Sequence, residues 1–404
     1  MGGYMTTFLR YRCASPKLLA IVCALSATSA SPVWAQSSFA PAANPVYVDD
    51  NAPSQSGTSY YDLNVQSVSN GYGCASDGCG DCYSEGCDPC DGNCSECAPC
   101  QPQGVPCFVF GEFLYIRASD ADVAHAQQQN GIGGAGTVPF GRIGTVEMDY
   151  HPAYRVGGGI GLDGCSTLSI SYTHFDGDSF DSLDPPTIPG GGGAVGSLVH
   201  HPATALTASA GPLDATYDIS YQLADLMFRD VWRSGPCHVL NYSLGALYAN
   251  LDQEFAQIGI FGGSSAGAIN TNTDIEFDGG GIKAGLDGER WLGGRLSIYG
   301  KASAAALSGR FNSRYDMQNV TTDALLAQAI WKDNRVISLV EYEVGLAVTS
   351  CNQCWRLSAG YMFQHWGNVV TTSNFIDGVQ ADNYTDLSDT ISFDGFTTRL
   401  EARF

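Results

Sequence analysis

Strict alternation of apolar and polar residues over long stretches is the feature that most constrains how this chain can fold. Apolar side chains recur at every second position in stretches such as 154–163, 240–248 and 340–348. A period of two puts these side chains on one face of a β-strand, whereas an amphipathic helix repeats every 3.6 residues. The pattern therefore predicts an all-β domain over residues 107–404.

Alternation alone fits both a soluble β-sandwich and a membrane barrel. The expected strands are longer than the usual ~5–6 residues and match the ~9–11 residues of a tilted membrane strand. The opposite face carries Gly, Ser, Thr and charges of both signs, as a wet lumen requires. Aromatic residues recur near the expected strand ends, at Tyr154, Tyr172, Tyr217, Tyr248 and Trp366. These features favour a transmembrane antiparallel up-and-down β-barrel over the sandwich.

Short and long connections alternate along this domain. Short links are expected at 164–165, 233–236, 289–294 and 349–353, and long ones at 119–152, 176–214, 250–274, 309–333 and 367–391. This is typical of short periplasmic turns and long external loops, and it predicts about ten strands, or twelve if the loops hide a hairpin. The alternation changes parity within 215–229 and 275–287, which indicates a β-bulge or a misplaced strand boundary.

The N-terminus has the pattern of a secretory signal peptide over residues 1–35. Arg10, Arg12 and Lys17 precede an apolar run over 18–30, and Val33 and Ala35 occupy the −3 and −1 positions of a cleavage site. The run is too short to cross the ~30 Å hydrocarbon core as a helix. We expect cleavage after Ala35, export, and an oxidising compartment.

Residues 36–106 are acidic, rich in cysteine, and contain no Lys or Arg. Such a periplasmic segment is expected to be largely without regular structure. In an exported chain its cysteines indicate first a disulfide framework, with zinc binding through CxxC pairs or intermolecular bridges as alternatives. No His lies among them, so no metal ligands are assigned.

Further cysteines fall in the barrel domain, in or beside its expected short turns. Together with those of residues 36–106, the disulfide candidates are Cys74, Cys79, Cys82, Cys87, Cys90, Cys94, Cys97, Cys100, Cys107, Cys165, Cys237, Cys351 and Cys354.

The net charge of the chain and the positions of its histidines exclude some classes of function. The formal net charge of −22 argues against nucleic-acid binding. The acidic excess concentrates in the expected external loops and in residues 36–106, which favours a mild cation preference at the mouth of a pore. The seven His residues fall in no recognised catalytic motif. We therefore expect neither an enzyme nor a cofactor.

Several segments together resemble the Legionella-type major outer membrane protein family of pore-forming barrels. They are residues 111–115, 221–226, 277–287 and 296–309, with the glycine run Gly279–Gly281 among them. The resemblance implies an outer-membrane pore of structural importance to the envelope, without catalytic residues. The alternating C-terminus ending in Phe404 resembles the signal read by the barrel assembly machinery. The expected location is the cell outer membrane.

Charged residues of both signs are expected to line the lumen beside small residues such as Gly157, Gly159 and Ser171, which would leave room for water. They are Glu112, Arg155, Asp163, Lys283, Asp287, Arg295, Lys301, Glu341, Glu343, Arg356, Arg399, Glu401 and Arg403. The predicted function is a porin-like passage for ions or small solutes. The alternatives are a non-conducting structural barrel cross-linked through its cysteine-rich segment, and a surface adhesion module. Expected partners are outer-membrane lipid, the barrel assembly machinery and disulfide-linked envelope components.

Overall fold

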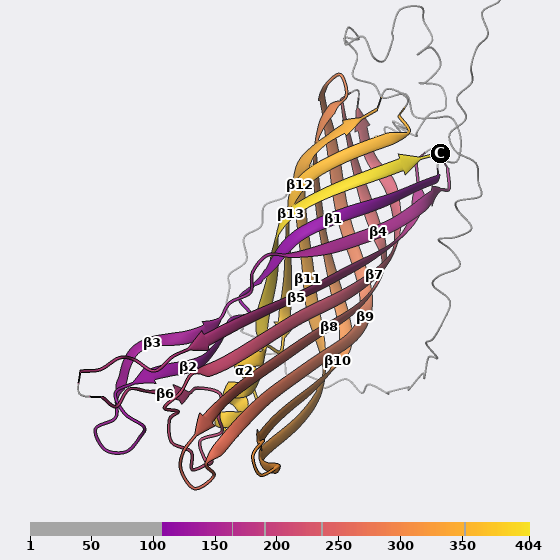
Figure 1. Cartoon of the computed structure of the whole chain (residues 1–404). Coiled ribbons are helices and arrows are strands. Elements are labelled where there is room, and N and C mark those ends of the chain that lie inside the picture. The colour runs from indigo at the N-terminus through magenta and orange to yellow at the C-terminus, as the bar shows by residue number, and fades with distance from the viewer. Residues whose placement is uncertain (1–106, 164, 190, 236, 351–352) are drawn as a thin grey trace, which may run out of the picture. The chain divides into compact units, whose positions relative to one another are not determined.

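The computed structural model describes residues 107–163, 165–189, 191–235, 237–350 and 353–404. Figure 1 shows the arrangement of the elements in this part of the chain. The predicted signal peptide (1–35), the cysteine-rich segment (36–106) and Cys351 lie outside the described residues.

Ten antiparallel strands close into a barrel, which confirms the predicted fold class. They are β1 (Cys107–Ser119), β4 (His151–Gly161), β5 (Thr167–Leu183), β7 (Leu213–Gly235), β8 (His238–Phe261), β9 (Gly267–Gly293), β10 (Leu296–Asn319), β11 (Ala324–Thr349), β12 (Trp355–Val369) and β13 (Asp389–Arg403). The barrel strands pair in chain order, and β1 pairs with both β4 and β13. This last pairing closes the ring and removes both sheet edges.

Further elements gather at one end of the barrel (Figure 1). Strands β2 (Val123–Gln129), β3 (Pro139–Val146) and β6 (Ala194–Ser197) form a small separate sheet in the order β3-β2-β6. Helix α2 (Thr372–Gln380) begins at Thr371, whose hydroxyl accepts a hydrogen bond from the Asn374 backbone N–H. We call this the loop end, and the opposite end, with the short turns and the first and last barrel residues, the turn end. Among the described residues, no helix combines the length and apolar character needed to cross a bilayer.

Two of the expected long loops are mostly strand. Strand β8 continues to Phe261 and β9 starts at Gly267, so little of 250–274 is irregular. Likewise β10 continues to Asn319 and β11 starts at Ala324. The hairpins therefore extend the barrel wall past the stretches in which an apolar outer face was recognisable in the sequence.

The predicted bulges are wrong, because the change of parity has another cause. In β7, pairing with β8 is continuous from Asp214 to Val231. Tyr217 and Tyr221 are fully buried inside the barrel, whereas Leu226 on the same strand points outward and is 50% exposed. Strand β9 behaves alike, with Phe277 buried and Ile282 exposed, and its pairing with β8 is also unbroken. The strands do not slip; the polarity of the two barrel faces reverses along them.

The reversal divides the barrel into two halves. In the turn half the outer face is apolar and the lumen polar, as for a wall that faces lipid. In the loop half the lumen is apolar and the outer face is acidic. There the register places Asp178, Asp218, Glu254 and Asp274 directly opposite one another on β5, β7, β8 and β9. Carboxylates in this density do not face hydrocarbon, so the bilayer contacts the turn half.

Candidate functional site: the barrel lumen

Arg155 of β4 is the centre of the polar lumen. The alternation of Tyr154, Arg155 and Val156 turns its side chain inward and its neighbours toward lipid. Its Nη2 atom lies 2.9 Å from Glu341 Oε1, and its Nη1 atom lies 3.6 Å from Glu112 Oε1. Its Nε–H donates to the Thr173 hydroxyl at 2.9 Å. One buried guanidinium thus joins β1, β4, β5 and β11.

Two lysines extend the ion pairs around the lumen. Lys283 Nζ lies 3.0 Å from Asp225 Oδ1 and 3.8 Å from Glu341 Oε2. On the adjoining wall, Lys301 Nζ lies 2.8 Å from Glu343 Oε2. The hydroxyl of Tyr299 donates to the other oxygen of Glu343 at 2.7 Å. All of these side chains except Lys301, which is 33% exposed, are largely buried, and each has at least one opposite charge within reach.

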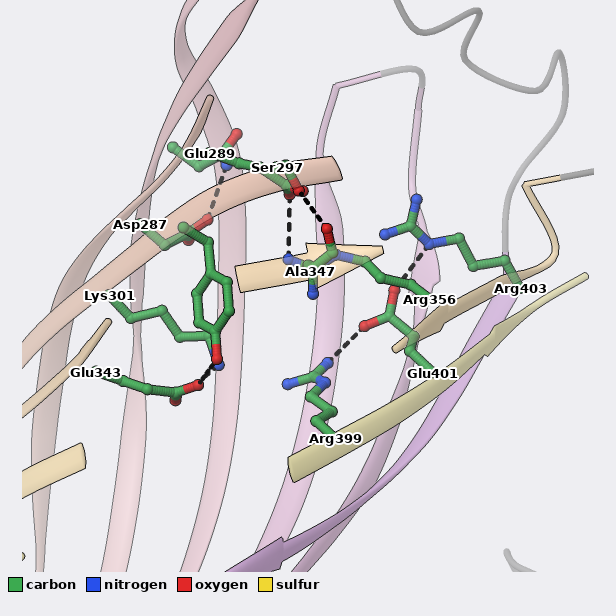
Figure 2. A network of polar contacts seen from close by, with 12 residues as sticks. Asp287, Glu289, Ser297, Lys301, Glu343, Ala347, Arg356, Arg399, Glu401 and Arg403 are labelled. Atoms are coloured by element: carbon green, nitrogen blue, oxygen red, sulfur yellow. Dashed lines mark hydrogen bonds and ion pairs between the residues drawn. The ribbon is translucent and has the colours of Figure 1, made fainter. Parts of the chain in front are cut away.

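A second network lies nearer the turn end, as Figure 2 shows. Glu401 Oε2 accepts from Arg399 Nη2 at 2.7 Å, and Glu401 Oε1 accepts from Arg403 Nε at 2.8 Å. Arg356 Nη2 lies 3.3 Å from Glu289 Oε2, and Glu289 also accepts from the Ser297 hydroxyl. Asp287 pairs with Arg229 and accepts from the Asn241 amide. The turn-end mouth is therefore lined by alternating charges.

An aromatic layer closes the lumen above the charges. The ring of Tyr221 lies 4.8 Å from that of Phe393, 5.4 Å from that of Phe175 and 5.9 Å from that of Trp366. All four side chains are fully buried. Because they come from β5, β7, β12 and β13, the layer crosses the barrel from wall to wall. It separates the polar turn half of the lumen from the loop end.

Helix α2 covers the aromatic layer at the loop end. Its inner face buries Phe375, Ile376 and Val379. Gln253 of β8 fixes the start of the helix, because its Nε2 donates to the Val370 carbonyl at 2.8 Å and its Oε1 accepts from the Thr372 backbone N–H at 3.2 Å. The side chain of Gln253 is itself fully buried. The helix is thus held to the barrel wall by both apolar packing and hydrogen bonds.

The structure places most of the expected lumen charges on inward-facing strand positions. These are Glu112, Arg155, Lys283, Asp287, Lys301, Glu341, Glu343, Arg356, Arg399, Glu401 and Arg403. Two assignments are wrong. Asp163 lies in the β4–β5 turn, where its Oδ1 caps the backbone N–H groups of Cys165 and Ser166, and Arg295 lies exposed in the β9–β10 turn. Alternation was extended past the strand ends at both positions.

Sequence reasoning missed several members of the network, among them Asp225, Tyr299, Arg229 and Glu289. Asp225 and Arg229 lie on β7, where the supposed parity change hid their inward direction. The only available signal was the position of Asp225 and Arg229 at even spacings from Tyr217 and Tyr221, since strand pairing is unbroken between them. Glu289 lies in the expected short link at 289–294, but β9 continues through it to Gly293.

The smallest lumen residues make space for aromatic rings. A Cβ atom on Gly157 would lie 2.7 Å from Phe110 Cζ, and one on Gly159 would lie 2.7 Å from Phe108 Cε1. A Cβ on Gly345 or on Gly360 would lie 2.7 Å from the Tyr299 hydroxyl. The expectation that Gly157 and Gly159 leave room for water is wrong, because the rings of Phe110 and Phe108 occupy that room.

Four of the disulfide candidates lie at the turn end. Cys107 starts β1, Cys165 lies in the β4–β5 turn, Cys237 in the β7–β8 turn, and Cys354 immediately before β12. Their pairing stays a prediction. Among the residues that the structure describes, no group of three or more His, Cys, Asp or Glu side chains is placed to hold a metal ion.

A closed antiparallel ring with an apolar outer band and a charged lumen defines the protein as an outer-membrane β-barrel. A family model described as Legionella pneumophila major outer membrane protein precursor matches residues 98–403. The chain belongs to this family.

Solved outer-membrane barrels resemble the chain more distantly. The outer membrane protease OmpT from Escherichia coli is 11% identical, with 74% of this chain and 98% of that chain covered and a TM-score of 0.40. A Pseudomonas aeruginosa FadL homologue is 7% identical (75% and 90% covered, TM-score 0.22), and an anion-selective porin from Comamonas acidovorans is 10% identical (74% and 100% covered, TM-score 0.12). A comparison with curated proteins gave no match.

Proposed function

We propose that this outer-membrane barrel is a narrow passage for ions or small solutes, closed in the conformation described here, and that it is not an enzyme. The observation that supports this most is the ring of ion pairs around Arg155 and Lys283 inside the lumen, at the level of the outer apolar band. A barrel that served only as a scaffold could be filled with apolar side chains at equal or lower free energy. Buried charges are costly, and a role in passing polar solutes explains their presence.

The aromatic layer and α2 form the barrier in this proposal. Ions cannot cross the closely packed layer of Phe175, Tyr221, Trp366 and Phe393 without its displacement, because a charge among buried aromatic rings loses its hydration. Helix α2 packs on the barrel through few large side chains, chiefly Phe375, Ile376 and Val379. The opening that we propose is movement of this helix with the chain around it, which then allows the four aromatic side chains to be displaced.

The acidic loop end supports a mild cation preference. Asp176 and Asp178 are exposed on the outer wall of β5. Asp181 lies on the inward face of the same strand, with its Oδ2 atom 2.8 Å from Nε2 of the buried His125. The preference we propose therefore comes from the summed field of carboxylates over the mouth and not from a ring of carboxylates in the lumen. Such a field acts within a Debye length of ~8–10 Å and weakens with salt.

Planar-bilayer recording of the full chain tests the proposal. Wild type should stay closed with rare small openings, and Phe375→Ser with Val379→Ser should raise the open fraction at least ten-fold. Phe180→Ser is the matched control, because Phe180 is 63% exposed on the outer wall. Reversal potentials in a KCl gradient should show cation preference that fades above ~0.5 M salt. A folded double variant that never conducts would refute the passage.

A second candidate is a non-conducting structural barrel. The observation that favours it is the complete burial of the aromatic layer, which resembles a protein core more than a gate. In this case the cysteine-rich segment would join the barrel to other envelope components by disulfides. Non-reducing gels of isolated envelopes would then show ladders that collapse with reductant, while bilayer recordings stay silent.

A further inference from the structure

A small cavity lies at the loop end, between the end of helix α2 and strand β11. Its volume is about 270 Å³. Three stretches of chain that are far apart in the sequence line it: residues 201–204 before β7, residues 326–329 of β11, and residues 379–384 at and after the end of α2. We call it the loop-end cavity. It is separate from the charged lumen, whose residues lie in the turn half of the barrel.

Part of the lining of the loop-end cavity is apolar. Leu326 and Ala329 come from β11, and Val379 comes from α2. The ring of Tyr384 also lines the cavity and lies 6.3 Å from the ring of Phe375, which α2 buries. These side chains can hold the hydrocarbon part of a small ligand, because pockets of this kind bind through apolar walls and orient the ligand with a few polar groups.

The polar part of the lining contains one carboxylate and no Lys or Arg. The carboxylate is that of Asp382, which is 83% exposed and has its Oδ1 atom 3.6 Å from His201 Nε2. The Nδ1 atom of His201 accepts from the Ala203 backbone N–H at 3.2 Å, so the neutral ring carries its proton on Nε2. Gln328 also lines the cavity, and its Nε2 donates to Asp316 Oδ1 at 2.7 Å. The formal charge of the lining is therefore negative.

The end of helix α2 adds to this negative potential. The helix ends at Gln380 with Ala381 as its C-cap, and it has no basic residue in its last turn. The C-terminus of a helix carries the negative end of the helix dipole, which favours a nearby cation. Asp382 follows directly, with a positive φ of 49°, so the carboxylate and the helix end lie together.

The basic residues of the neighbouring strands do not cancel this charge. Arg314 of β10 pairs with Asp316, and Arg335 of β11 pairs with Asp333. Lys332 is exposed on the outer wall of β11 and does not line the cavity. The loop-end cavity thus combines an apolar surface with an uncompensated carboxylate.

We propose that the loop-end cavity binds a small alkylammonium ion, with its ammonium group at Asp382 and its hydrocarbon part against Leu326, Ala329 and Val379. The ion pair with the carboxylate and the face of the Tyr384 ring supply the attraction for the cation. The ligand contacts both the end of α2 and β11, so it holds the helix to the barrel wall. This inference does not depend on whether the barrel conducts.

Saturation-transfer NMR of the full chain in detergent, with butylammonium chloride as the probe, tests the site. Asp382→Asn should weaken binding at least five-fold, because the carboxylate charge is lost. Asp386→Asn is the matched control, since Asp386 is an exposed carboxylate on the same connection but outside the lining, and it should leave the affinity unchanged. The neutral analogue 1-butanol and the anion butyrate should bind at least five-fold more weakly than butylammonium. Binding should also weaken in ~0.5 M NaCl, because Asp382 is exposed.

A second pair of variants tests the apolar part of the site. Ala329→Leu should fill the cavity and lower the affinity at least five-fold, whereas Ala324→Leu, at the exposed start of β11, should not. Amide hydrogen exchange should slow at residues 326–329 and 379–384 when butylammonium is present. Heat-modifiable migration on gels verifies that each variant retains its barrel. No binding, equal binding of 1-butanol, an affinity indifferent to Asp382→Asn or Ala329→Leu, or slower exchange confined to other segments would overturn the proposal.

Discussion

At the scale of single residues, Glu341 connects the two cations of the central lumen. It lies 2.9 Å from Arg155 and 3.8 Å from Lys283. Glu341→Gln should destabilise the barrel by about 3–5 kcal/mol, because removal of one partner leaves a buried cation uncompensated. The midpoint of urea unfolding, followed by heat-modifiable migration, measures the loss. Glu147→Gln, at an exposed position, should change nothing. Equal midpoints for the two variants would contradict the pairing.

His200 makes the stability of the folded loop end depend on pH. It lies between β6 and β7, its ring centre 4.4 Å from that of Phe261, and its Nε2 is buried without a partner. Burial lowers the pKa of His200 to about 3 from its ordinary value near 6.5. The folded state thus resists protonation, and stability that is present above pH 6.5 is lost as pH falls toward 3, by up to ~1.4 kcal/mol per unit.

His200→Leu should remove this loss. Unfolding midpoints of wild type should fall between pH 6.5 and 4, whereas those of the variant should fall less. His201→Gln is the neighbouring control, since the His201 ring lies 3.6 Å from the exposed Asp382 and has a partner. If wild type and His200→Leu lose stability in parallel, His200 is not the group that titrates.

How far the site could be predicted from the sequence also depends on single residues. Arg155 was assigned inward correctly because Tyr154 and Val156, on either side, are apolar and face lipid. Its partners were beyond reach, since Glu341 is distant in sequence and only strand register brings the two together. Asp225 was missed because the polarity of its strand reverses within a few residues. Alternation therefore predicts which face of the sheet a residue lies on. It does not predict the residue's partner, nor whether that face contacts lipid, water or a packed interior.

At the scale of the strand, the reversal of polarity between the two barrel faces has an energetic cost, because it brings carboxylates together on the outer face of the loop half. Register places Asp218 of β7 directly between Asp178 of β5 and Glu254 of β8. Like charges directly opposite destabilise a sheet by ~0.2–1 kcal/mol per pair. Asp218→Asn should therefore stabilise the loop half by about 0.5–2 kcal/mol at low salt, and the gain should vanish above ~0.5 M NaCl.

Amide hydrogen exchange of β7 and β8 residues in the loop half measures this gain. Ser220→Asn on the same outer face is the control, since it removes no charge. Faster exchange in Asp218→Asn at low salt, or an equal gain in the control, would contradict repulsion across these strands.

Helix α2 shows the limit of prediction at the element scale. The sequence around residues 367–391 contains polar and small residues with turn formers, and it was interpreted as an external loop. Its helical conformation depends on tertiary partners, namely the Gln253 side chain and the apolar upper lumen. The alternating strands were predictable because their pattern is local, whereas a nine-residue helix gains its stability from packing.

At the scale of the whole molecule, the two halves of the barrel face different media. The outward-facing residues of β8 change in character along the strand. Leu244 (57% exposed) lies in the apolar band, Asp252 and Glu254 follow it, and Ile260 (71% exposed) lies at the loop end. At ~3.3 Å per residue, Leu244 and Ile260 are roughly 53 Å apart along the strand, which is roughly 40 Å along the axis for strands tilted by ~35–45°. An apolar band ~25 Å tall cannot include both. Exposed apolar residues at the loop end, such as Ile258 and Ile260, therefore lie outside the band.

Brominated lipids test this placement of the bilayer. In chains whose native Trp residues are replaced by Phe, a single Trp at Leu244→Trp should lose most of its fluorescence in bilayers brominated on the acyl chains. A single Trp at Ile260→Trp should lose almost none, although both positions point outward from one strand and are similarly exposed. Soluble acrylamide should quench them in the opposite order. If lipid bromine quenches Ile260→Trp as strongly as Leu244→Trp, the bilayer covers the loop half, and the acidic rows on β5, β7, β8 and β9 would have to lie within it.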